Sequence, residues 1–136
     1  MNVEVLKKAE QLAAKAGHLF VATADAKGWP HVAAAGRLAL TAENRVLVTE
    51  WFCPGTVANL QVNPRISLVI WDSATDVGNQ LIGELEDIKD VGMLDGYAPQ
   101  VEGKMPVPQI ERQLLVNSDR VFEFKRAPHT DVEECE

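Results

Sequence analysis

Apolar residues recur at two spacings along this chain, and the change of spacing predicts where a helix gives way to strands. Residues 3–16 carry apolar side chains at helical spacing, and Gly17 can end the helix in a left-handed turn. Beyond Gly17 the apolar residues form short runs separated by turn residues, which is typical of antiparallel strands. These runs predict six strands, over residues 19–24, 31–40, 46–51, 66–71, 80–89 and 121–124.

The connections between the runs predict turns and one short helix. Residues 25–28 predict a hairpin turn, with a glycine that supplies the unusual dihedral angle. Residues 56–62 predict a helix that the Thr56 hydroxyl can cap. Asn63-Pro64 fits its end, because the residue before a proline is pushed out of the helical region. The remaining segments are interpreted as a loop at 76–79, an irregular stretch at 90–108, and either strand or helix at 110–116.

The run at 66–71 is apolar on both faces of its predicted strand. One face carries Ile66, Leu68 and Ile70, and the other carries Val69 and Trp71. Both faces of such a strand must be covered, whereas a small barrel closed from a single sheet buries only its inside. A second copy of the chain is the simplest cover for the other face, so the sequence predicts a homodimer.

Length and charge narrow the class of protein. The 136 residues suffice for one domain, which we assign to residues 1–128, and we expect 129–136 to be a mobile acidic tail. The net charge of −7 argues against binding to nucleic acid or to an anionic membrane. No apolar run approaches the roughly 20 residues of a membrane span. The N-terminus also has no apolar signal core, so we expect a cytoplasmic protein. Cys53 and Cys135 follow no metal-binding spacing.

The start of the predicted short helix could receive an anion. Gly55 directly precedes this predicted helix, and the predicted strand at 46–51 lies shortly before it in the chain. The first turn of a helix carries free N–H groups and a partial positive charge, which suit a phosphate. An ordinary helical connection between two strands fits the same residues.

The predicted strand at 31–40 is unusual in its small side chains. It contains Ala33, Ala34, Ala35 and Gly36 in succession, and these residue types are poor strand formers. Such a choice suits a strand against which something packs closely: a flat ring, a partner strand or the first helix. If the strand is continuous, Ala35 and Leu38 lie on opposite faces.

The chain from Gly17 to Ile88 resembles the pyridoxamine 5′-phosphate oxidase-like family of FMN-binding split β-barrels. The likeness is carried by Trp29-Pro30-His31, the small-residue strand, the run at 46–52, and the series Thr56, Asn59-Leu60, Asn63-Pro64 and Ile66-Ser67-Leu68. The resemblance implies a mainly β fold with short helices (α+β). More specifically, it implies a six-stranded antiparallel split β-barrel that forms a homodimer with two flavin sites at the interface.

The resemblance also implies FMN as the cofactor and places it on particular residues. The flavin ring would lie near Ala33, Ala34 and Ala35 and near Thr49, Glu50 and Trp51. The phosphate would lie near Gly55 and Thr56. The resemblance then implies a redox protein, and an FMN-dependent oxidoreductase is one activity that this family offers. It assigns neither a catalytic residue nor a metal.

One departure from the family pattern leaves a second hypothesis open. Relatives commonly carry a lysine directly before the threonine of the helix start, where this chain has Gly55. Arg37 or Arg65 could supply the missing positive charge. Alternatively, the scaffold has lost FMN and binds another ligand, such as haem or a deazaflavin, or has a non-catalytic role.

Overall fold

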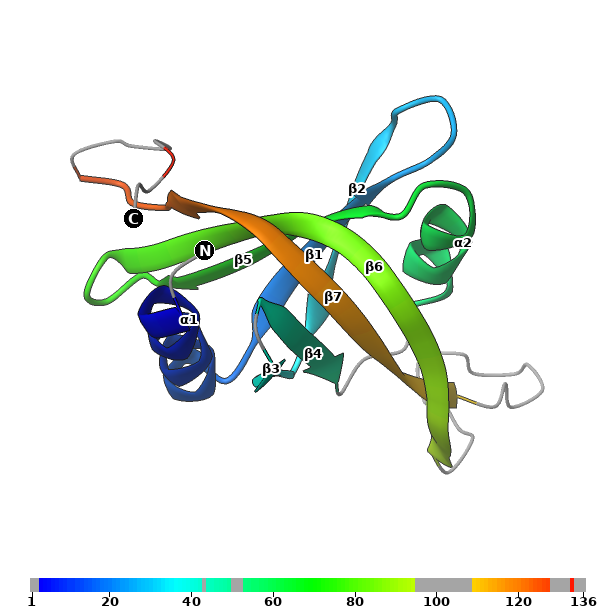
Figure 1. Cartoon of the computed structure of the whole chain (residues 1–136), viewed down its shortest axis with the longest axis horizontal. Helices are drawn as coiled ribbons and strands as arrows, with labels where there is room; N and C mark the ends of the chain where they lie inside the picture. The colour runs from blue at the N-terminus through cyan, green and yellow to red at the C-terminus, as the bar shows by residue number, and fades with distance from the viewer. Residues whose placement is uncertain (1–2, 43, 50–52, 95–108, 128–132, 134–136) are drawn as a thin grey trace, which may run out of the picture.

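The chain folds into one antiparallel sheet with two helices (Figure 1). This computed structural model describes residues 3–42, 44–49, 53–94, 109–127 and 133. Among these residues, no helix is long and apolar enough to cross a membrane. The elements in chain order are α1 (Val3–Ala16), β1 (Leu19–Ala24), β2 (Pro30–Ala35), β3 (Arg37–Ala42), β4 (Arg45–Thr49), α2 (Pro54–Val62), β5 (Arg65–Asp72), β6 (Val77–Leu94) and β7 (Gln109–Glu123).

The order of the strands explains why the sheet curls into a split barrel. The seven strands pair in the order β2-β1-β5-β6-β7-β4-β3. β2 and β3 therefore form the two edges of the sheet, although only Gly36 separates them in the chain. The sheet must curl to bring its edges to this residue, while β2 and β3 do not pair with each other. The predicted mainly β split-barrel fold is confirmed, with seven strands instead of the six predicted.

The additional strand arises because the predicted strand at 31–40 breaks at Gly36. Ala35 and Leu38 were expected on opposite faces, yet both lie in the core, with 5% and 4% of their surface exposed. A bend at Gly36 turns the chain between them, so the alternation of faces starts again in β3. Gly36 therefore lies at the corner where the chain leaves β2, at one edge of the sheet, and enters β3, at the other edge.

The last two strands are longer than their local sequence indicates. β6 begins at Val77, within the predicted loop, and continues to Leu94, while β7 joins the ambiguous residues 110–116 to the predicted strand at 121–124. The two strands pair along their length, with shifts of register at three points. Pairing with a long partner thus extends each strand through residues that would not form one alone. Residues 95–108, the rest of the stretch predicted to be irregular, lie outside the described residues.

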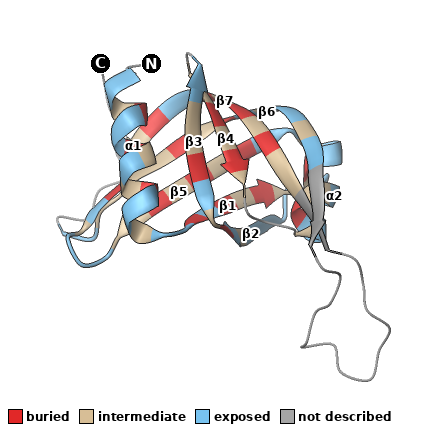
Figure 2. Ribbon diagram, turned by 90° about the horizontal axis from the view of Figure 1, so that it is seen from below, coloured by how far each residue is buried: buried red, intermediate tan, exposed pale blue. Residues whose placement is uncertain are grey.

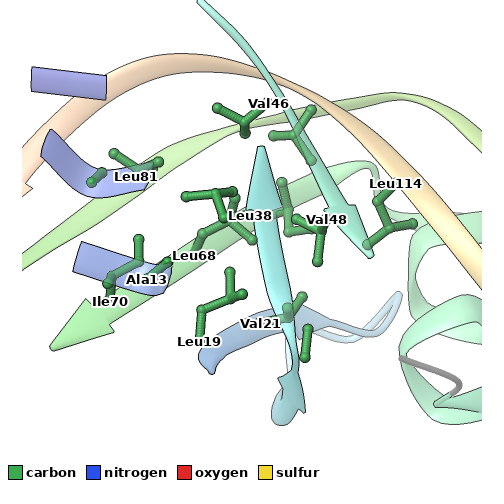
Figure 3. Packing of buried hydrophobic residues seen from close by; sticks show 14 of the residues in the cluster. Ala13, Leu19, Val21, Leu38, Val46, Val48, Leu68, Ile70, Leu81 and Leu114 are labelled. Atoms are coloured by element: carbon green, nitrogen blue, oxygen red, sulfur yellow. The ribbon is translucent and has the colours of Figure 1, made fainter. Parts of the chain in front are cut away.

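The core lies between the curled sheet and α1 (Figure 2). Leu6, Ala9 and Ala13 form the buried stripe of α1, as the helical spacing predicts. They pack with the inward residues of the strands, among them Leu19, Leu68 and Leu81 (Figure 3). Figure 1 shows α1 and α2 near opposite ends of the sheet.

The two faces of β5 differ in how far they are covered. Ile66, Leu68 and Ile70 are buried, as predicted. Val69 and Trp71 on the outer face are half-buried. The Trp71 ring meets the Phe124 ring edge to face, with 6.0 Å between the ring centroids. Part of the second apolar face is therefore covered within the chain, and the homodimer stays a prediction.

The turn between β5 and β6 is tied to the end of β7 by one carboxylate. Asp76 accepts hydrogen bonds from the Trp71 indole N–H at 3.0 Å and from the backbone N–H groups of Arg126 and Ala127, each at 2.8 Å. The bond from the Arg126 N–H contributes most to lowering the pKa of Asp76, followed by the bond from Trp71. Asp76 holds a left-handed backbone with φ of 56°, which aspartate and asparagine tolerate better than most residues.

We expect Asp76→Asn to lower the free energy of unfolding near neutral pH. Asparagine tolerates the same backbone, but its NH₂ group would face a backbone N–H in place of an acceptor oxygen. Because the folded-state pKa of Asp76 is lowered, its contribution to stability is present above the unfolded pKa and is lost as pH falls through the folded pKa. Urea unfolding of both proteins between pH 7 and pH 2.5 should show their difference shrinking with acid. A constant difference would contradict this role.

Candidate functional site

The start of α2 leaves polar groups without partners inside the helix. The helix begins at Pro54, two residues earlier than predicted, because a proline fits the first helical position with its φ fixed and no N–H to satisfy. The N-cap is Cys53, whose side chain makes no capping hydrogen bond. Gly55 and Thr56 lie in the first turn, where backbone N–H groups have no acceptor within the helix.

Thr56 is the most unusual polar residue of this turn. The sequence predicts that its hydroxyl caps the helix, but Thr56 lies two residues inside the first helical position and its Oγ1 has no hydrogen-bond partner. The residue is fully buried. A buried hydroxyl without a partner costs about 1–3 kcal/mol. Thr56 Oγ1 shares this property with Ser118 Oγ among the described residues. Such a group calls for an explanation, and for Thr56 an anion received at the helix start would provide one.

His31 lies against the same turn, from a different part of the chain. A Cβ placed on Gly55 would lie 3.3 Å from Nε2 of His31. His31 belongs to β2 and is exposed. The imidazole therefore lies beside the position at which relatives carry the lysine that this chain lacks. No sequence spacing connects a strand residue with a helix start 24 positions later, so this approach of His31 to Gly55 is visible only in the structure.

The sheet holds α2 in place behind this turn. Asn59 Nδ2 donates a hydrogen bond to Thr23 Oγ1 at 3.0 Å, and Thr23 is the residue of β1 that pairs with His31. The bond fixes the middle of α2 to the inward face of β1, so Gly55 and Thr56 lie over the β1–β2 pair. A helix start is thus set beside the edge strand β2.

The alanines predicted to lie near a flavin ring fall on different faces of β2. Ala33 lies on the inward face with His31 and is half-buried, Ala34 is exposed on the outer face, and Ala35 is in the core. β2 is an edge strand, so one side of its backbone is free of sheet pairing. A flat ligand could bind this backbone edge, and only small side chains would flank it.

The other residues predicted to bind FMN or to supply a positive charge come from β4, from the start of β5 and from residues outside the described part of the chain. Thr49 is the last residue of β4 and pairs with Arg37 at the start of β3, while Glu50 and Trp51 lie outside the described residues. Arg65 opens β5 beyond the end of α2, so the length of the helix, about 13 Å for nine residues, separates it from Gly55. Arg65 is therefore badly placed to neutralise an anion at the helix start.

The three described elements that form the helix start carry little charge. β1, β2 and α2 contain no Lys, Arg, Asp or Glu, and His31 is the titratable side chain on these three elements. The partial positive charge of the helix start is therefore not opposed by a carboxylate on the elements that form it. Within the described part of the chain, no group of three or more His, Cys, Asp or Glu side chains could hold a metal ion. The described residues at the helix start suit an anionic ligand.

The fold and the site together define a split β-barrel protein whose second helix begins beside an edge strand. The chain belongs to the pyridoxamine 5′-phosphate oxidase family, whose sequence profile matches residues 5–122. The resemblance noted from the sequence is thereby confirmed. Among proteins with a curated description, none matches the sequence.

Several solved structures share this fold. HupZ of Group A Streptococcus has a TM-score of 0.62 and 22% identity, over 93% of this chain and 97% of that one. A Clostridium acetobutylicum protein related to general stress protein 26 has a TM-score of 0.65 and 16% identity, over 98% and 96%. An FMN-binding protein from Nostoc punctiforme, related to pyridoxamine 5′-phosphate oxidase, has a TM-score of 0.62 and 13% identity, over 89% and 84%.

The shared fold extends to proteins named for other ligands. HutZ, a haem storage protein from Vibrio cholerae, has a TM-score of 0.53 and 16% identity, over 92% of this chain and 97% of that one. An F420 reductase has a TM-score of 0.56 and 18% identity, over 82% and 94%. At these identities the likeness is one of fold, and the choice of ligand depends on the residues of the site.

Proposed function

We propose that this protein binds FMN, with the phosphate at the first turn of α2 and the flavin ring along the edge of β2. The buried Thr56 hydroxyl without a partner carries the proposal, because a phosphate oxygen can accept the hydrogen bond that Oγ1 leaves unmade. Backbone N–H groups of the same turn point to the same ligand class. FMN supplies redox chemistry when bound, and the residues of this chain bind and orient it.

The ring position follows from the edge strand. The free backbone edge of β2 can exchange hydrogen bonds with the polar rim of a flavin, and Ala33 and Ala34 leave room beside it. Because Ala35 is in the core, the contact with a ligand is assigned to the first two alanines and the backbone. Thr49 and the predicted Glu50 and Trp51 remain candidates for the other side of the ring.

In this proposal His31 contacts the phosphate in place of the lysine that relatives carry at the position of Gly55. Its imidazole lies beside Gly55 and can donate an N–H hydrogen bond to a phosphate oxygen. A charge-assisted hydrogen bond contributes about 1.5–3 kcal/mol. A lysine introduced at Gly55 would have to displace this ring, which is exposed and can turn away.

Titration of the apo-protein with FMN, followed by flavin fluorescence and absorbance, tests the proposal. We expect saturable binding to the wild-type protein and about tenfold weaker binding to His31→Gln, which removes the imidazole beside Gly55. In Gly55→Lys/His31→Ala the cation comes from the position that it occupies in relatives, and affinity should return to within about threefold of wild type. Absence of saturable FMN binding to every variant would reject FMN as the ligand.

The homodimer is part of the same proposal. Val32 is 63% exposed and Phe20 is 37% exposed on the outer face of β1 and β2, next to Val69 of β5. Apolar side chains gathered on one sheet face favour an interface with a second copy, and obligate dimers commonly bury about 2,000 Å² or more. The partner would also bring residues toward the free edge of β2.

Multi-angle light scattering should therefore give twice the chain mass at micromolar concentration. Val32→Glu should shift the protein toward the monomer, because it introduces a charge on the outer face of the edge strand. Val62→Glu is the matched control, since Val62 is 61% exposed and lies on α2. A monomeric wild-type protein, or equal effects of both variants, would contradict this interface.

The competing function is a scaffold that has exchanged FMN for haem or a deazaflavin. The lack of any charged side chain on α2 favours it, and the names of HutZ and the F420 reductase show that this fold accommodates such roles in other proteins. Haem and F420 are therefore titrated in parallel with FMN. Preferential binding of either one would establish the alternative.

A further inference from the structure

A hollow near the other end of the sheet is lined by an unusual concentration of lysines. Lys8 and Lys15 of α1 face Val77 at the start of β6, and Lys125 just beyond the end of β7 completes the wall. The hollow has a volume of about 410 Å³, which falls in the range of small-molecule sites. We call it the lysine hollow. α1 and α2 lie near opposite ends of the sheet in Figure 1, so the lysine hollow is separate from the proposed FMN site.

The helical repeat explains why these side chains converge. Positions 8, 11, 12 and 15 lie on one stripe of α1, beside the buried stripe of Leu6, Ala9 and Ala13. That neighbouring stripe faces the beginning of β6. The result is a wall of two lysines, one glutamine and one leucine opposite Asn79 and Lys125.

The charges of the lysine hollow are poorly compensated. The chain has a net charge of −7 and only seven lysines, three of which line this one hollow. Lys15 forms an ion pair with Asp72 at 3.0 Å. Within the described residues, Lys8 and Lys125 have no carboxylate within salt-bridge distance, and Glu123 is the single acidic residue of the lining. Cations gathered in a concave surface raise the local concentration of anions.

Backbone hydrogen bonds hold the floor of the lysine hollow in place without a ligand. The Phe124 N–H donates to the Gly78 carbonyl at 3.1 Å, and the Arg126 N–H donates to Asp76 at 2.8 Å, so the backbone is held on both sides of Lys125. A Cβ on Gly78 would come within 2.6 Å of the Ile70 carbonyl oxygen. Such close packing keeps the strand ends in one arrangement.

The residue types indicate a class of ligand. Lysine presents a compact charge and is a common phosphate binder, whereas arginine, which is absent from the lining, is preferred for the two-pronged recognition of a carboxylate. Leu12 and Val77, the latter 49% exposed, offer apolar surface beside the charges. We infer that the lysine hollow binds a small organic phosphate, with its phosphate among the lysines and its apolar part on Leu12 and Val77.

Phenyl phosphate is a suitable probe, titrated into the ¹⁵N-labelled full-length protein and followed by amide shifts. The amides of Gln11, Leu12, Gly78 and Asn79 should shift together and saturate. Lys8→Gln/Lys125→Gln should weaken binding about tenfold. Lys7→Gln, which removes one lysine charge from the same helix outside the lysine hollow, should bind within about twofold of wild type. Thermal melting of each variant checks that it remains folded.

Two further titrations distinguish a phosphate site in the lysine hollow from general anion binding and from binding at α2. Benzoate should bind clearly more weakly than phenyl phosphate, and equal binding would overturn the assignment to a phosphate. Thr56→Val should leave phenyl phosphate binding at the lysine hollow unchanged. A loss in Thr56→Val, with none in the lysine double variant, would place the probe at α2 and overturn the inference. Equal losses in Lys7→Gln and the double variant, or no saturable shifts in the wild-type protein, would also overturn it.

Discussion

Replacing Thr56 with valine should stabilise the apo-protein and weaken FMN binding at the same time. Valine has nearly the shape of threonine and lacks the hydroxyl, which is buried without a partner. Removing an unsatisfied buried hydroxyl should raise the free energy of unfolding by about 1 kcal/mol. Losing a hydroxyl that donates to a phosphate should weaken FMN binding about tenfold or more. Opposite signs in the two measurements would mark the hydroxyl as retained for a ligand.

Thr23→Val is the matched control for this experiment. Thr23 is also buried, but its Oγ1 accepts a hydrogen bond from Asn59. The same substitution there should lower the free energy of unfolding by about 1–3 kcal/mol, because it leaves the Asn59 N–H without its acceptor. Urea unfolding gives the stabilities and fluorescence titration gives the affinities. If Thr56→Val destabilises the protein, the hydroxyl has a structural role; if FMN affinity is unchanged, the phosphate does not lie at this turn.

The largest loss of stability is expected from Gly83→Ala, at the bulge where β6 pairs with β7. A Cβ on Gly83 would lie 1.9 Å from the Asn117 carbonyl oxygen and 2.9 Å from the Ser118 Cα. Both are backbone atoms of the partner strand, so the clash is relieved only by moving the strands apart. We expect the free energy of unfolding to fall by about 3 kcal/mol, at the upper end of the usual cost of overpacking.

Gly55→Ala adds the same methyl group where the neighbour can move. Its Cβ would meet the His31 ring at 3.3 Å, and alanine is favoured over glycine in a helix by up to about 1 kcal/mol. Stability should therefore change by less than about 1 kcal/mol in urea unfolding. A Gly83→Ala protein as stable as the Gly55→Ala protein would mean that the β6–β7 bulge tolerates a side chain, contrary to this expectation.

The sequence by itself determined the class of fold and most of its elements. The helical spacing of residues 3–16 predicts α1 with its buried stripe, and the alternating runs predict β1, β4 and β5 because each strand buries one face. The apolar run at 66–71 identifies β5, in which Ile66, Leu68 and Ile70 are buried. The series Thr56, Asn59-Leu60 and Asn63-Pro64 identifies α2 and the family.

Only the tertiary structure decided the rest, because it depends on contacts between distant residues. The bend at Gly36, which sends β2 and β3 to opposite edges of the sheet, follows from the curling of the whole sheet and leaves no signal in local periodicity. The length of β6 and β7 follows from their mutual pairing. The candidate site shows the same limit. The sequence selects Gly55 and Thr56 from a local pattern, whereas the approach of His31 to Gly55 and the missing partner of Thr56 exist only once β2 and α2 are packed together.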